Sequence, residues 1–141
     1  PDIVKCNQED EFSVDILLNT KGSDIVASAA YLSYDKSKME VKRLLLSDSA
    51  FSLAPEQEVV AEEGKIKITV AEPTPGVNTY KGKIATVIFK ATEKSQPLKD
   101  NISIDFTEGS DLFSTAILDD GKGTNVLDSV AGSKVYINEK N

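Results

Sequence analysis

The stretch DIVASAAYLSYDKSKMEV, residues 24–41, carries the strongest structural signal in this chain. Side chains on a β-strand point to alternate faces, so its first half divides into an inward set and an outward set. Both sets are fairly apolar, which predicts a central strand with one covered face and one face only partly in water. The predicted inward set is Val26, Ser28, Ala30, Leu32 and Tyr34, and the predicted outward set is Ala27, Ala29, Tyr31 and Ser33.

A tight corner follows this strand. The carboxylate of Asp35 can accept a hydrogen bond from the backbone two residues on and begin a turn. Met39 and Val41 then open another alternating segment. The stretch therefore predicts strand, corner and strand, and it contains no catalytic signature.

Alternating segments recur along the rest of the chain, at residues 12–19, 66–70, 81–92, 102–106 and 134–138. Turn residues separate them, and no convincing helix appears. Regular short strands of this kind predict an all-β fold, a sandwich of roughly nine antiparallel strands. In the loop at residues 47–55 we expect Phe51 and Leu53 to reach the core.

Composition limits the partners. At 141 residues we expect one domain, residues 1–141. The formal net charge of −7 argues against nucleic acid and against anionic lipid, because phosphates would be repelled. No apolar run approaches the roughly 20 residues that span a bilayer, so we expect no membrane insertion within this stretch. The chain begins at Pro1, and we expect a domain excised from a longer surface protein.

The sequence offers few residues that could act in catalysis. The chain has no histidine, which removes Ser-His-Asp and Cys-His arrangements and the usual general base. The adjacent carboxylates Glu62-Glu63 and Asp119-Asp120 would point to opposite faces on a strand, so they are interpreted as solvated turn charges. The single cysteine, Cys6, cannot form an internal disulfide and is interpreted as a small apolar filler. We therefore predict that the protein is not an enzyme.

The chain has one candidate calcium-binding loop. Hard oxygen ligands gather near the C-terminus, at Asp119, Asp120, Asn125 and Asp128. Their spacing matches no EF-hand, and turn geometry alone explains the glycines between them. We expect no cofactor and keep calcium at these four residues as the alternative.

Three segments resemble the cohesin family, nine-stranded jelly-roll modules related to a family of carbohydrate-binding modules on cellulosome scaffolds. They are FSVDI at residues 12–16, AAYLSYD at 29–35 with MEV at 39–41, and GKIATVIFKA at 82–91. The resemblance implies a jelly-roll β-sandwich and a non-catalytic module of bacterial or archaeal origin. It also implies an extracellular or cell-surface assembly in which the module binds a dockerin-type or other protein partner.

The resemblance also suggests a binding face. In cellulosomal cohesins the sheet that carries this strand binds dockerin, helped by Asn and Asp at outward positions before the Tyr-Asp corner. Ala27 and Ala29 occupy these positions here. If the strands are neighbours, the outward surface consists of Ala27, Ala29, Tyr31, Thr86 and Ile88, a weakly polar patch that suits a protein partner. A loop that covers this patch is the alternative.

Three other functions stay open on the sequence. The first is a carbohydrate-binding module with a polysaccharide ligand, although the chain has no Trp and only four Tyr for an aromatic platform. The second is a structural spacer domain of an adhesin. The third is a glycosidase, which needs two carboxylates at roughly 5–10 Å across a cleft.

Overall fold

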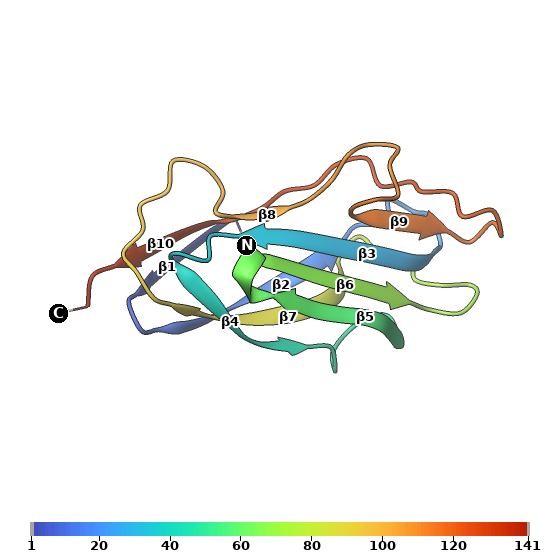
Figure 1. Cartoon of the computed structure of the whole chain (residues 1–141). Helices are drawn as coiled ribbons and strands as arrows, with labels where there is room; N and C mark the ends of the chain where they lie inside the picture. The colour runs from blue at the N-terminus through green and yellow to red at the C-terminus, as the bar shows by residue number, and fades with distance from the viewer. Residues whose placement is uncertain (1, 141) are drawn as a thin grey trace.

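The computed structural model describes residues 2–140 and is an all-β sandwich with one 3-10 turn, η1 (Figure 1). The sequence predicted roughly nine strands, and ten short strands are present in the described part. No helix in this part is long and apolar enough to cross a membrane. The elements are β1 Ile3–Asn7, β2 Glu11–Leu18, β3 Ile25–Tyr34, β4 Met39–Leu45, β5 Leu53–Val60, η1 Ala61–Glu63, β6 Lys65–Ala71, β7 Gly82–Ala91, β8 Ile102–Ile104, β9 Thr115–Leu118 and β10 Lys134–Asn138.

The strands form two main layers and a small closing pair. The β3 sheet has the order β5-β6-β3-β8, and β9 pairs with β3 further along the same edge as a separate short strand. The β7 sheet has the order β2-β7-β4. All of these pairings are antiparallel, as predicted, but β1 and β10 pair in parallel. In Figure 1, β3, β6 and β5 lie side by side in one layer, and β2 and β7 lie behind them.

Strand β3 is the centre of its sheet. It pairs with β6 along one edge and with β8 and β9 along the other. Both edges of its backbone are therefore hydrogen-bonded within the sheet, which confirms the central strand predicted from the sequence. Its inward side chains include Ser28, Ala30, Leu32 and Tyr34, all buried.

The core lies between the two sheets and contains a cluster of three aromatic rings. Phe89 is 0% exposed. Its ring stacks on Phe12 with centroids 5.3 Å apart and meets Tyr34 edge-on at 5.6 Å. These residues come from β7, β2 and β3, so this cluster joins the two sheets.

Two predicted core positions are wrong. Val26 is only half-buried, and Ile25 takes its place with 0% exposure. The pairing of β3 with β9 shifts register between Ile25 and Ala27, and such a bulge inserts one residue and reverses the alternation. Leu53 is 53% exposed because it pairs with Ala71 on the outward side of the edge strand β5, whereas Phe51 is buried as expected.

Replacing Phe89 by alanine should lower the free energy of unfolding by about 3–5 kcal/mol, because it removes a buried ring and leaves a cavity between the sheets. Chemical denaturation measures this change. Ile88→Ala is the matched control, since Ile88 is the neighbour on β7 that points outward, and we expect a loss below about 1 kcal/mol. Equal losses in the two variants would contradict the assigned orientation of β7.

Candidate functional site

The outward surface of the β3 sheet, called here the outer face, is defined by strand register. Residues directly opposite one another in an antiparallel pair point to the same side. One row across the sheet is Glu58, Lys67 and Tyr31, and the next is Glu56, Thr69 and Ala29. The outer face consists of Ala27, Ala29, Tyr31, Ser33, Leu53, Glu56, Glu58, Lys65, Lys67, Thr69 and Ala71.

A hydrogen-bonded triad holds the middle of the outer face. The hydroxyl of Tyr31 donates to Glu56 Oε1 at 2.9 Å, and the hydroxyl of Thr69 donates to the same oxygen at 2.9 Å. The three side chains come from β3, β5 and β6 and fix one another across the sheet. The hydrogen bond to Glu56, with partial burial, raises the pKa of Tyr31. The phenol of Tyr31 therefore stays protonated, and able to donate to Glu56, to a higher pH than an ordinary tyrosine does.

A second polar cluster lies beside the triad. Lys65 Nζ donates to Ser33 Oγ at 2.5 Å and forms an ion pair with Asp105 Oδ2 at 3.3 Å. Ser33 Oγ in turn donates to Asp105 Oδ1 at 2.7 Å. Lys67 and Glu58 lie opposite each other on β6 and β5, and neither forms an ion pair within 4.0 Å with a described residue.

The far end of the outer face is apolar. Ala27, Ala71 and Leu53 form one row across the sheet, and Ile117 of β9 lies opposite Ala27 on its other side. The outer face thus passes from an apolar row, through the triad, to a cluster of charges. A surface with an apolar region beside ordered polar groups and free charges suits a protein partner.

The surface predicted from the sequence is divided by the structure. Ala27, Ala29 and Tyr31 lie together on the outer face, as expected. Thr86 and Ile88 do not join them, because β7 pairs with β2 and β4 in the other sheet. The side chains of Thr86 and Ile88 therefore lie on the outward surface of the β7 sheet, on the opposite side of the sandwich. The prediction that these five residues form one surface is wrong. Alternation identifies the face of a strand and says nothing about which sheet the strand joins.

The sequence reasoning missed the residues that organise the outer face. Glu56, Thr69 and Lys65 make its principal hydrogen bonds. A signal for them exists in the sequence, because Glu56 and Glu58 on β5 and Lys65, Lys67 and Thr69 on β6 repeat with a period of two. That periodicity places them on one face but does not show that they meet Tyr31.

The outward side of the β7 sheet has a different character. Its charges are largely paired with one another: Lys83 with Asp15 at 3.7 Å, Arg43 with Glu11 at 3.6 Å and Lys90 with Glu9 at 3.2 Å. Thr86 donates to Asp15 Oδ1 at 2.6 Å. This side satisfies its own polar groups and offers a partner fewer free charges than the outer face.

The four residues of the calcium alternative are held separately. Asp119 accepts from Thr74, Asp120 from Thr124, and Asp128 from Lys21. The fourth, Asn125, accepts from the backbone of the β9 residue Ala116. Within residues 2–140, no three His, Cys, Asp or Glu side chains are grouped so that they could hold a metal ion. The structure therefore does not bring these carboxylates together.

A comparison with protein-family sequence models identifies the family of this chain. The sequence model of the cohesin domain matches residues 2–122, most of the chain. The chain belongs to the cohesin family. A search of the curated proteins gave no match.

Solved cohesin structures resemble this cohesin over nearly its whole length. A type I cohesin–dockerin complex from Clostridium thermocellum is 21% identical with a TM-score of 0.70, covering 96% of this chain and 94% of that one. A non-cellulosomal cohesin from the archaeon Archaeoglobus fulgidus is 19% identical with a TM-score of 0.69, covering 96% and 86%. A cohesin module of a Clostridium perfringens family 33 glycoside hydrolase is 15% identical with a TM-score of 0.69, covering 99% and 93%. At these identities the likeness establishes the fold.

Glu56→Gln should move the pKa of Tyr31 back toward its ordinary value, because the carboxylate that favours the protonated phenol is lost. A pH titration of ¹³C-labelled tyrosine by NMR measures this. Because the folded-state pKa of Tyr31 is raised, its contribution to stability is present below pH 10.0 and is lost as the pH rises through the folded value.

Glu58→Gln is the control for this titration, since Glu58 lies two residues along β5 and makes no hydrogen bond to Tyr31. It should leave the pKa of Tyr31 unchanged. An equal shift in both variants, or no shift in either, would contradict the triad.

Proposed function

We propose that this cohesin is a non-catalytic protein-binding module and that its outer face binds a dockerin-type partner. The observation that carries the proposal is the triad of Tyr31, Glu56 and Thr69, which is ordered across three strands of the β3 sheet. Side chains that are already held in place lose little conformational freedom when a partner binds, and this favours affinity.

Charged side chains without an ion pair also favour the outer face as the binding surface. Lys67 and Glu58 lie in the row of Tyr31 without an ion pair of their own among the described residues. Unpaired charges beside a bound surface select partners by electrostatic complementarity and speed their association. The charges on the β7 sheet are already neutralised by neighbours, so that side is the poorer candidate.

The likeness to cohesins solved together with dockerins supports the class of partner. In this chain the outward positions of β3 before the corner are Ala27 and Ala29, which offer no polar side chain. The polar groups that can recognise a partner lie instead on β5 and β6, at Glu56, Thr69 and Lys67. The partner of this cohesin is therefore a dockerin with contacts matched to β5 and β6. Membership of the family also supports a place in an extracellular or cell-surface assembly.

Tyr31→Lys should weaken dockerin binding at least 100-fold, because it breaks the triad and adds a charge at the centre of the face. Isothermal titration calorimetry against a panel of purified dockerin modules measures this. Ile88→Lys is the matched control, with the same substituent on the opposite side of the sandwich, and it should bind like the wild type.

Chelating calcium should abolish binding, because the dockerin holds the ion in its own loops and needs it. The Tm of this cohesin alone should stay unchanged.

Two outcomes would overturn the proposal. If Ile88→Lys lost binding while Tyr31→Lys retained it, the β7 sheet would be the binding side. If no dockerin in the panel bound the wild type, with or without calcium, the partner would belong to another class.

A further inference from the structure

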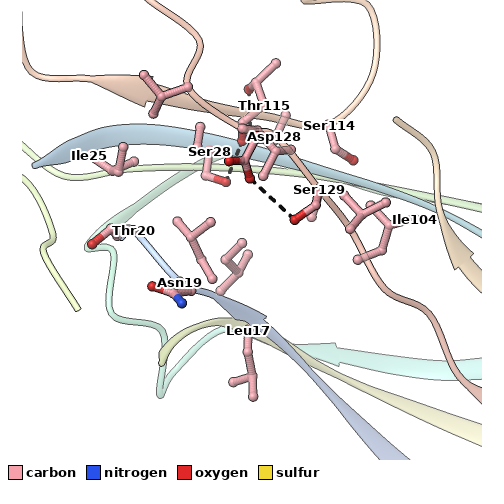
Figure 2. A pocket seen from close by; sticks show the side chains of 18 of the residues that line it. Leu17, Asn19, Thr20, Ile25, Ser28, Ile104, Ser114, Thr115, Asp128 and Ser129 are labelled. Atoms are coloured by element: carbon pink, nitrogen blue, oxygen red, sulfur yellow. Dashed lines mark hydrogen bonds between the residues drawn. The ribbon is translucent and has the colours of Figure 1, made fainter. Parts of the chain in front are cut away.

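A hollow lies between the two sheets, at the corner where β3 meets β9. Its volume is about 550 Å³. Figure 2 shows its walls, with Ser28 and Thr115 on one side and Asn19, just after β2, on the other. Residues 126–131, called here the strap, cross its outer side.

The sequence explains why this corner is underfilled. Apart from Ile25, the inward residues of the β3–β9 corner are small: Ser28 and Ala30 on β3, and Ser114 and Ala116 at β9. Along the other edge of β3, the inward residues of β6 are all Ile or Val. Protein interiors are normally close-packed, so small side chains on one wall leave space that the opposite wall does not fill.

The lining of the hollow is more apolar than polar, and its buried hydroxyl groups are already hydrogen-bonded. Ser28 Oγ donates to the carbonyl of Thr115 at 2.8 Å, and Ser114 Oγ accepts from the backbone N–H of Tyr31 at 2.9 Å. No buried side-chain nitrogen or oxygen in residues 2–140 is without a hydrogen-bond partner. The hollow therefore offers a ligand mainly carbon surface, from Ile16, Leu18, Ile25 and their neighbours.

The mouth carries a closed ion pair. Lys21 Nζ lies 2.7 Å and 2.9 Å from the two carboxylate oxygens of Asp128, which belongs to the strap. Each charge cancels the other, so the mouth favours neither an anion nor a cation. Val126 and Val130 are exposed around it, whereas the floor residues Ile25 and Ala116 are buried.

The strap has few polar ties to the sandwich, although Leu127 packs against the core. Val126 donates its N–H to the carbonyl of Ala116 at 2.8 Å, but residues 128–131 make no backbone–backbone hydrogen bond with the described part of the chain. The ion pair between Lys21 and Asp128 is thus the principal polar contact of its outer half, and exposed ion pairs of this kind are weak. Displacing residues 128–131 would therefore break this ion pair and no strand pairing.

We propose that the hollow is a second binding site, separate from the outer face, for one small, uncharged and largely apolar molecule such as an aromatic or short alkyl compound. Its volume lies within the range of small-molecule sites. The carbon lining supplies the affinity, and the neutral mouth excludes strongly charged compounds. The molecule enters when the strap lifts and the ion pair opens.

The test uses the uncharged dye N-phenyl-1-naphthylamine, whose fluorescence rises in apolar surroundings. The wild type should bind it saturably with a stoichiometry of one, and 1-decanol should displace it. Ala116→Leu fills the hollow and should weaken dye binding at least tenfold, with an unchanged or higher Tm. Lys21→Ala releases the strap and should speed dye association several-fold. Ile88→Ala, on the opposite side of the sandwich, is the control and should bind like the wild type.

The proposal is overturned if the dye does not bind the wild type saturably. It is also overturned if Ala116→Leu binds the dye as well as the wild type does, because the dye would then lie on the surface. A lower Tm for both Ala116→Leu and the second filling variant, Ala30→Leu, would show that the corner is already packed and would overturn it as well.

Discussion

The two-sided pairing of β3 is the constraint on which the rest of this structure depends. Its backbone is hydrogen-bonded to β6 on one edge and to β8 and β9 on the other, which fixes the register of four strands at once. Because that register is fixed, the side chains of β3 have only two directions available. Leu32 and Tyr34 point into the core, where Tyr34 meets Phe89, and Ala29 and Tyr31 point to the outer face.

The same register produces the difference between the two sides of the sandwich. Tyr31 and Thr69 reach one carboxylate because β3, β6 and β5 are adjacent and in step. On the β7 sheet, opposite charges on different strands form ion pairs at 3.6 and 3.7 Å and neutralise one another locally. The polar groups on the outward side of the β7 sheet are thus paired with one another. The outer face instead carries ordered acceptors and charges without an ion pair, and it is the better surface for a partner.

Much of this architecture could be predicted from the sequence because β-strands show their two faces as a period of two. The alternation around Tyr31 predicted the central strand, and Asp35 predicted the corner, where its carboxylate accepts from the N–H of Ser37 at 3.1 Å. The sheet that each strand joins could not be predicted, because a period of two is the same in either layer. This is why Thr86 and Ile88 were placed on the wrong side.

Local irregularities were also beyond the sequence. The bulge near Ile25 depends on how β9 meets β3, which is a contact between residues far apart in the chain. The position of Glu56 beside Tyr31 and the hollow under the strap likewise depend on long-range packing. Small residues such as Ala30 and Ala116 gave no sign of a cavity, since alanine is common in well-packed strands.

Chemical-shift mapping tests most directly which sheet recognises the partner. A ¹⁵N-labelled sample of this cohesin would be titrated with a dockerin that binds it, and the amide spectrum followed. Binding through the outer face predicts the largest shifts at residues 27–33 of β3 and at 56–69 of β5 and β6, with β2, β4 and β7 little changed. Large shifts confined to β2, β4 and β7 would contradict it.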